Sequence, residues 1–180
     1  MAQPHPPQPV KLIVGMLSRG KSLFTLAERE MQSLWGPLDV HSDTMPFTHT
    51  TYYEKEMGAP LLRKFVSFAR LIEPGDLAPI KHQTNALEEQ LAHTPEGRSF
   101  EVTRPINLDP GYLDPGKLVL ATTKNYSHRI YIGQNMYAEA TLHYHKGAWR
   151  AWPYTYPDYA SGDYHDFLNQ ARQKLLDRSS

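Results

Sequence analysis

The first half of the chain alternates between strand-like and helix-like spacing of hydrophobic residues. Residues 10–17 form a mostly apolar run that predicts a buried strand. Apolar residues then recur every three or four positions over 23–34, which predicts a helix that ends at Gly36. Residues 38–56 are β-branched, aromatic and polar, and they predict a strand pair or one long strand broken at Pro46.

The next segment repeats this succession of strand and helix. We expect a strand over residues 61–72, because the turn-forming sequence 73–76 follows it, and a helix over 77–92 with Pro79 in its first turn. Another strand is expected to begin at 100–102. In chain order these elements are β-α-β-β-α-β, the ferredoxin-like arrangement, and they predict an α+β fold.

The C-terminal half is predicted to contain turns, strands and a hairpin. Two Asp-Pro-Gly sequences predict turns at 109–111 and 114–116, and residues 117–123 predict a strand. Residues 128–145 alternate with a period of two on both sides of a loop, which predicts a β-hairpin. Apolar residues at helical spacing over 164–175 predict a terminal helix. The hairpin and this helix are therefore expected to extend the ferredoxin-like unit.

The register of the hairpin follows from its hydrophobic positions. Placing the apolar residues of both strands on one face requires a three-residue loop at 133–135. That register sets Tyr131 opposite Tyr137 and Arg129 opposite Glu139, all on the other face of the hairpin.

Length and composition limit the classes of function. A chain of 180 residues is expected to form one domain, over residues 10–180, behind a disordered Pro-rich leader at 1–9. Its nineteen basic and nineteen acidic residues cancel, which argues against a nucleic-acid partner. Cysteine is absent, so a metal would have to bind His, Asp or Glu side chains. We expect no membrane partner and a cytoplasmic location, because neither a membrane-spanning stretch nor a secretory signal is visible.

A cluster of hydroxyl groups and positive charges lies where a predicted strand ends and the hairpin begins. Such groups hold phosphates or carboxylates, and Arg can make two-pronged hydrogen bonds to them. Glu139 would orient Arg129, although the two residues would also make an ordinary cross-strand pair. The cluster consists of Thr122, Thr123, Lys124, His128 and Arg129.

Two further groups of polar residues would complete such a site. Asp109, His128 and Glu139 are candidates for a general acid or base, although an Asp-Pro-Gly turn also accounts for Asp109. One polar stripe of the helix at 77–92 indicates either a solvated face or a ligand contact. The stripe contains Lys81, Thr84, Asn85 and Glu88.

Glu54 and Glu56 are the candidates for a metal site. They stand two residues apart on the strand expected within 38–56, so their carboxylates would share one face and could hold Mg²⁺ opposite basic residues. The alternative is a solvated strand edge. Mg²⁺ is the cofactor that this pair would bind, and the sequence leaves any other cofactor unknown.

Residues 15–22 match the phosphate-binding P-loop pattern G-x-x-x-x-G-K-[ST] between a predicted strand and a predicted helix. In a P-loop, Gly15, Gly20, Lys21 and Ser22 would surround the phosphates and a magnesium ion. The remaining sequence does not predict a parallel sheet, and no second strand ends in an aspartate for magnesium. The alternative interpretation is a strand end, a loop and a helix with Ser22 as its N-cap.

Several runs of residues resemble a known family. They are residues 47–58, 107–112, 122–125, 128–131, 137–142 and 152–159. Together they resemble the bacterial domain-of-unknown-function family numbered 4416 over nearly the whole chain. The resemblance implies no established activity, and it implies that Gly20-Lys21-Ser22 is not a shared feature of the family.

Three hypotheses for function follow. The first is that the chain binds or turns over a small anionic ligand, phosphate-bearing or a nucleotide, in a polar pocket beside the hairpin face. The second is a P-loop protein that binds GTP or ATP. The third is a non-catalytic interaction module that uses the Trp and Tyr side chains of residues 149–159. The sequence does not decide whether the protein is an enzyme, and it gives no oligomeric state.

Overall fold

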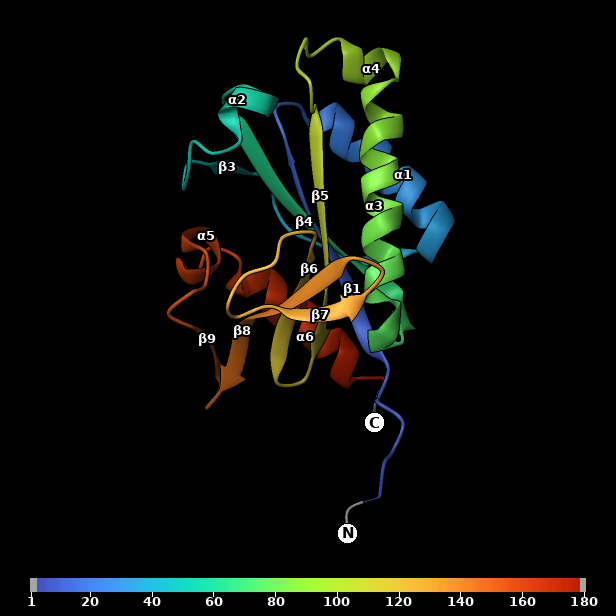
Figure 1. The fold of residues 1–180 in the computed structure, drawn as a ribbon, viewed down its shortest axis with the longest axis vertical. Helices are drawn as coiled ribbons and strands as arrows, with labels where there is room; N and C mark the ends of the chain where they lie inside the picture. The colour runs from blue at the N-terminus through green and yellow to red at the C-terminus, as the bar shows by residue number, and fades with distance from the viewer. Residues whose placement is uncertain (1–2, 179–180) are drawn as a thin grey trace.

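The computed structural model describes residues 3–178, which form a nine-stranded sheet with helices on both faces (Figure 1). Residues 1–2 of the predicted leader lie outside the described residues, and residues 3–9 have no regular secondary structure. The strands are β1 (Val10–Ser18), β2 (Leu38–His41), β3 (Met45–Phe47), β4 (Leu61–Ile72), β5 (Ile106–Asp114), β6 (Lys117–Thr122), β7 (Ile130–Gly133), β8 (Met136–His145) and β9 (Ala148–Ala151). The helices are α1 (Lys21–Trp35), α2 (Glu54–Met57), the 3₁₀ helix η1 (Pro74–Asp76), α3 (Leu77–Ala92), α4 (Pro95–Arg98), α5 (Pro157–Ala160) and α6 (His165–Leu176).

The strands run in the order β2-β4-β1-β5-β6-β8-β7, and the paired strands among the described residues are all antiparallel. Outside this path, β3 pairs with β4 and β9 pairs with β8. Helix α1 lies between β1 and β2 in the chain, and α3 lies between β4 and β5. The fold is therefore a mixed α and β fold built on a large antiparallel sheet.

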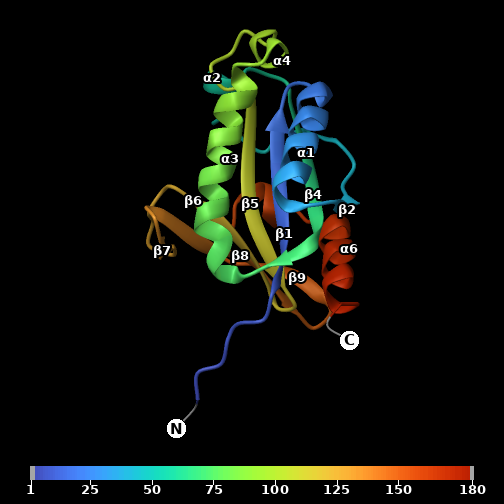
Figure 2. The same cartoon turned by 90° about the vertical axis from the view of Figure 1, so that its right-hand side faces the viewer.

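Hydrophobic side chains pack against both faces of this sheet. On one face, α1 and α3 lie side by side over β1 and β5 (Figure 2), and they cover Leu12, Val14 and Met16. On the other face, α6 packs with Ile13 and Phe65. Because β1 is buried on both faces, its sequence is a nearly continuous apolar run rather than an alternating one.

The octet that matches the P-loop pattern is strand over half of its length. Gly15 and the three residues after it pair with both β4 and β5. Only Arg19 and Gly20 separate β1 from α1, so this octet contains no loop long enough to wrap around a phosphate. Gly20 is the N-cap of the helix rather than Ser22, whose hydroxyl donates a hydrogen bond to Glu96.

The segment between α1 and β4 differs from the prediction. Instead of long strands over 38–56, it contains the short strands β2 and β3, and Pro46 lies inside β3. Proline is tolerated there because β3 pairs only with β4 and forms an edge. Residues 54–57 form α2, so the expected strand that carries Glu54 and Glu56 on one face is wrong.

Two further predictions around β5 are wrong. No strand begins at 100–102, because Glu101 has a φ of 53°, a left-handed conformation that a strand does not accommodate. The sequence 109–111 is not a turn but the middle of β5. Pro110 has no N–H to donate to β6, and pairing with β6 begins only at Gly111. The second Asp-Pro-Gly sequence does form the predicted turn, between β5 and β6.

The predicted hairpin is confirmed, with a correction to its loop. Tyr131 lies opposite Tyr137, as expected. The loop is the two-residue turn Gln134-Asn135, in which both residues have positive φ. A bulge at Ile132 takes up the third residue that we assigned to the loop. The two differences compensate each other, so Tyr131 still lies opposite Tyr137. A second bulge, at Thr141 of β8, places Leu142 on the face opposite Ala138, so that part of the prediction is wrong.

The remaining elements agree with their predictions. The strand over 61–72 is β4, the helix over 77–92 is α3, and the terminal helix is α6. Within residues 3–178, none of the helices is both long enough and apolar enough to cross a membrane.

Candidate functional site

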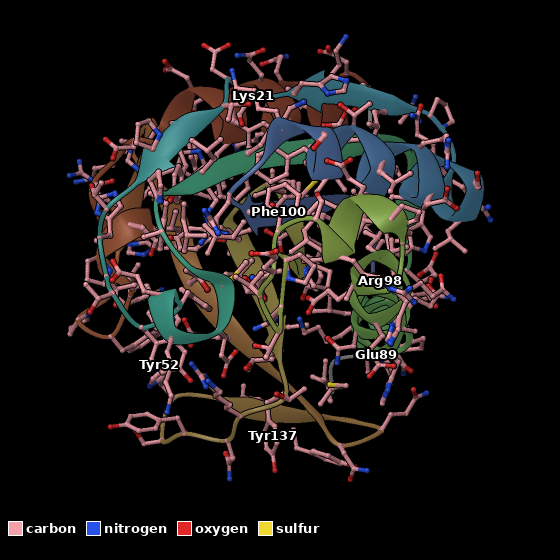
Figure 3. The ribbon with its side chains drawn as sticks, turned by 90° about the horizontal axis from the view of Figure 1, so that it is seen from above. Lys21, Tyr52, Glu89, Arg98, Phe100 and Tyr137 are labelled. Carbon is pink, nitrogen blue, oxygen red and sulfur yellow. The ribbon has the colours of Figure 1, made fainter. Side chains whose placement is uncertain are left out.

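A cavity of about 1080 Å³ opens where β6 separates from β5. Its walls come from the half of β5 that does not pair with β6, from α3, and from the ends of β6 and β8. The segments at 47–56 and 156–159 complete them. Tyr52 and Glu89 line it, and Figure 3 shows them on opposite sides of the opening. This volume is at the upper end of the range for small-molecule sites.

The cavity brings together most of the residues that we predicted for a ligand site. They are Lys81, Asn85, Asp109, Thr122, Thr123, Lys124, Arg129 and Glu139, together with Glu56. His128 does not line the cavity but lines a smaller pocket beside it. The P-loop candidates Gly15, Gly20, Lys21 and Ser22 are absent from its lining, and Figure 3 shows Lys21 on the opposite side of the molecule from the hairpin residue Tyr137.

Two side chains of α3 replace the missing strand beside β5. Lys81 Nζ donates to the carbonyl oxygen of Leu108 (3.0 Å), and the Leu108 N–H donates to Glu88 Oε1 (2.7 Å). Lys81 and Glu88 are two helical turns apart, so they lie on the same face of α3. They satisfy the backbone groups that a neighbouring strand would otherwise pair, which keeps this half of β5 open to the cavity.

Asp109 lies among positively charged and amide groups. Its Oδ1 atom is 3.4 Å from Lys81 Nζ, and its Oδ2 atom accepts a hydrogen bond from Asn107 Nδ2 (2.5 Å). Burial alone would raise the pKa of this carboxyl, but Lys81, Arg63 and Asn107 hold its pKa below the usual value. Asp109 is therefore ionised at neutral pH and is a weak general base, so its surroundings do not favour the predicted role as a base.

Arg104 extends this network toward the outside. Its Nε and Nη2 atoms donate to Glu88 Oε2 (3.0 and 2.7 Å), and Nη2 also donates to Asn107 Oδ1. Burial raises the pKa of Glu88, against the opposing effect of Arg104 and Lys81. The segment before β5 carries Arg104, and no sequence signal distinguished it from other loop arginines.

The expected pair across the hairpin is present. Arg129 Nε donates to Glu139 Oε2 at 2.9 Å, and His128 Nε2 lies 2.9 Å from the same oxygen. The other two guanidinium nitrogens of Arg129 donate to the carbonyl oxygen of Lys124 (3.0 Å) and to the hydroxyl of Tyr156 (2.6 Å). Since each nitrogen of Arg129 contacts protein, this residue fixes the cavity wall and offers no unoccupied fork to an anion.

Lys124 and two threonines lie at the rim of the cavity. Lys124 makes no salt bridge within residues 3–178; its Nζ donates to the hydroxyl of Tyr52 (2.7 Å) and lies 4.7 Å from the centre of that ring. Thr122 is half-buried and Thr123 is exposed at the end of β6. These positions match the predicted anion-holding cluster, and their charge and hydroxyl groups are accessible from the cavity.

Arg63 of β4 was not predicted as a site residue. Its side chain lines the cavity and is 3% exposed. Nη2 donates to Asp158 Oδ2 at 3.2 Å, and Nη1 lies 4.0 Å from Asp109 Oδ2. In the described part of the chain, Nε and Nη1 have no hydrogen-bond acceptor. Buried polar groups normally have partners, so these two nitrogens, which are shielded from solvent, are an exception.

Gly15 provides space for the ring of Phe65 and lies beside Arg63. It lies on β1, opposite Phe65 on one side and Asp109 on the other. A Cβ atom at position 15 would stand 2.8 Å from Phe65 Cε1 and 3.4 Å from Arg63 Nη1. Close packing against the Phe65 ring therefore accounts for the first glycine of the octet.

The glutamates that we predicted for a metal site do not form one, and only Glu56 reaches the edge of this network. Glu54 and Glu56 are exposed on α2, and Glu56 Oε2 is 4.0 Å from Arg104 Nη1. Over residues 3–178, no three His, Asp or Glu side chains are placed to hold a metal ion together. The geometry gives no support to a Mg²⁺ site on these two residues.

The charges that line the cavity nearly balance. Among the described lining residues, five are Lys or Arg and six are Asp or Glu. Any preference for an anion must therefore come from Arg63 and Lys124, whose donors are not all engaged by carboxylates, rather than from net charge. The salt bridges of the lining cations are Lys81 with Asp109, Arg104 with Glu88, Arg129 with Glu139, and Arg63 with Asp158 through Nη2 alone.

Comparison with known proteins identifies a family without an activity. Residues 8–175 match the family described as Domain of unknown function (DUF4416). No curated protein and no solved structure matches the chain. The family match includes every residue that lines the cavity. By this match over nearly its whole length, the chain belongs to the DUF4416 family.

Proposed function

We propose that the protein binds a small ligand that carries a phosphate or carboxylate group, and that Arg63 holds this group. The proposal rests on one observation, the two unpaired nitrogen atoms of a buried guanidinium beside the cavity. A buried donor without a partner costs about 1 to 3 kcal/mol, and an acceptor supplied by a ligand would remove that cost.

The other lining residues support binding rather than turnover. Lys124, Thr122 and Thr123 would add a charge and hydroxyl groups at the rim. Asp109 and Glu139 each accept hydrogen bonds from nearby donors, so both carboxylates orient cations and neither is free to take a proton. The function that the geometry supports best is therefore anion binding without an assigned reaction.

Calorimetric titration of the full chain with inorganic phosphate, pyrophosphate and ribose 5-phosphate tests this proposal. We expect Arg63→Met to weaken binding about 10- to 150-fold, the equivalent of a hydrogen bond to a charged group. Lys21→Ala is the matched control, because Lys21 lies outside the cavity, and it should bind as the wild type does. Unchanged affinity in a folded Arg63→Met variant would exclude the proposed role of Arg63.

A second variant covers the case in which Arg63→Met does not fold. Lys124 is exposed, so Lys124→Ala is expected to fold and to weaken binding severalfold. Failure of all three probes to bind the wild type would contradict the proposed function, whereas loss of binding in Lys21→Ala alone would favour the P-loop hypothesis.

We also propose that β1, α1, β2, β4, α3 and β5 form a ferredoxin-like unit. The strand order β2-β4-β1-β5, the antiparallel pairing and the positions of the two helices support this assignment. An experimental structure in which β1 runs parallel to β4 or β5 would contradict it.

A further inference from the structure

A smaller pocket of about 340 Å³ adjoins the cavity on the side of the hairpin. The two spaces share Lys124, Arg129 and Tyr156, so they lie next to each other at these side chains. We call the smaller space the ring pocket. Its other lining residues are Asn125, Tyr126, His128 and Tyr154.

The aromatic side chains of the ring pocket form a stacking surface. The rings of Tyr154 and His128 are stacked, with centroids 4.2 Å apart and planes inclined by 10°. Tyr126 meets the same imidazole at 5.2 Å in an edge arrangement and is 66% exposed. The guanidinium of Arg129 lies 6.0 Å from the centre of the Tyr156 ring. Exposed rings and guanidinium groups are the surfaces on which proteins stack a planar base.

Asn125 adds a group that could recognise the edge of such a ring. It lines the ring pocket, it is exposed, and its side chain makes no hydrogen bond within residues 3–178. A primary amide offers both donors and an acceptor. Heterocyclic bases present the same combination at their edges, whereas an apolar ring would leave this amide without a partner.

Tyr156 and Asp158 connect the ring pocket to Arg63. The Tyr156 hydroxyl accepts a hydrogen bond from Arg129, and Asp158, two residues later, accepts one from Arg63. Two residues span at most about 7 Å of backbone. The segment 156–158 therefore contributes to both places, and a ligand that reaches both would lie along it.

We propose that the ligand joins an anionic group to a planar heterocyclic ring, as a nucleoside monophosphate does, with the phosphate at Arg63 and the base in the ring pocket. This inference rests on the proposed function, because it takes Arg63 as the residue that holds the anion. It also accounts for part of the aromatic segment: Trp149 is buried in the core, whereas Tyr154 and Tyr156 line the ring pocket.

Titration of the full chain with adenosine, guanosine, cytidine and uridine monophosphates, with ribose 5-phosphate and with the four nucleosides tests the inference. At least one monophosphate should bind about 5- to 150-fold more tightly than ribose 5-phosphate, the value of stacking one base. Tyr126→Ala should remove most of this gain and leave the affinity for ribose 5-phosphate unchanged. Tyr131→Ala is the control, since Tyr131 is also an exposed tyrosine but lines neither space.

The outcomes separate this inference from the proposed function. If ribose 5-phosphate binds in an Arg63-dependent manner and no monophosphate binds more tightly, the ring pocket is not a base site although the anion site stands. If nucleosides bind as tightly as monophosphates, the base site is supported. The phosphate then adds nothing to binding, and the proposed role of Arg63 is wrong. If a gain from the base persists in Tyr126→Ala and disappears in Tyr131→Ala, the base lies elsewhere and the inference is overturned. Absence of binding by every probe would overturn both.

Discussion

Two buried cations on neighbouring strands of one sheet have very different surroundings. Lys11 of β1 is fully buried, and its Nζ donates to Asp39 Oδ2 (2.6 Å) and to the carbonyl oxygen of Phe68 (2.9 Å). Asp39 in turn accepts a hydrogen bond from the Ser67 hydroxyl (2.6 Å). Arg63 of β4 makes one hydrogen bond to a carboxylate, while Nε and Nη1 have no acceptor among the described residues.

Location accounts for this difference. Lys11 and its partners line neither the cavity nor the ring pocket, whereas Arg63 lines the cavity. Burial lowers the pKa of Lys11, and the hydrogen bond to Asp39 opposes that shift. Lys11 therefore finds its hydrogen-bond acceptors within the chain, whereas Arg63 leaves two donors without acceptors beside the cavity. We infer that the acceptors for Arg63 come from the proposed ligand.

The largest expected effect is the loss of Lys11. Lys11→Met leaves the Asp39 carboxylate without its cation, which should lower the free energy of unfolding by about 3 to 5 kcal/mol. Arg63→Met also removes the cation beside a buried carboxylate, but Asp158 keeps the Tyr164 hydroxyl and the two unpaired nitrogens of Arg63 are lost with the side chain, so it should cost less, about 1 to 3 kcal/mol. Chemical denaturation measures both values. A smaller cost for Lys11→Met than for Arg63→Met would show that the comparison is wrong.

A smaller effect is expected for Gly15→Ala. The added methyl group would overlap Phe65 and press on Arg63, which should cost about 1 to 3 kcal/mol of stability and weaken phosphate binding. Denaturation and calorimetric titration test the two effects. Gly75→Ala is the matched control, since a Cβ atom there has no heavy atom within 4 Å. If Gly15→Ala keeps wild-type stability, as Gly75→Ala should, then packing against Phe65 and Arg63 does not require glycine at position 15.

The smallest effect concerns sensitivity to acid. Burial alone would raise the pKa of Asp39, but hydrogen bonds from Lys11 and Ser67 hold its pKa below the usual value of 3.8. A carboxyl with a lowered folded-state pKa stabilises the fold above its unfolded-state pKa, and this stabilisation is lost as the pH falls through the folded-state pKa. The free energy of unfolding, followed from about pH 6 to about pH 3, should therefore fall less in Lys11→Met than in the wild type.

The same measurement on Arg63→Met refines the comparison. The pKa of Asp109 is lowered first by Lys81, then by Arg63 and Asn107, so this variant should keep most of the wild-type pH dependence. Equal pH dependence in the wild type and Lys11→Met would mean that the Asp39 pair does not couple folding to protonation.

The hydrophobic pattern of the sequence predicted structure best where segments adjacent in the chain pack against each other. The alternation of residues 128–145 predicted the register near the turn, including the contact of Arg129 with Glu139, but it did not predict the bulge at Thr141. The convergence of Lys81, Asp109 and Lys124 was expected from their chemistry, and the cavity joins them. Pro110 was misinterpreted because Asp-Pro-Gly is a strong local turn signal. Pro110 can lie inside β5 because β6 does not pair with β5 at this residue. That arrangement depends on the tertiary fold and is not visible in the local sequence.

Arg63 could have been identified from the sequence. Leu61, Arg63, Phe65 and Ser67 occupy the alternate positions of β4 that face the interior. A charged residue at such a position is rarely fully buried without partners, which is itself a signal for a site. By contrast, the short helix that carries Glu54 and Glu56 has no periodic pattern of its own, so sequence spacing could not reveal it.

The Leu108 peptide group makes the cavity observable from the backbone. Its amide proton is held by the carboxylate of Glu88 and its carbonyl oxygen by the ammonium of Lys81, so both bonds end on side chains near the ligand space. A ligand that attracts either side chain must change the polarisation of this one peptide. The NMR chemical shifts of its amide nitrogen and proton would then report whether a ligand is bound, with no label placed in the cavity itself.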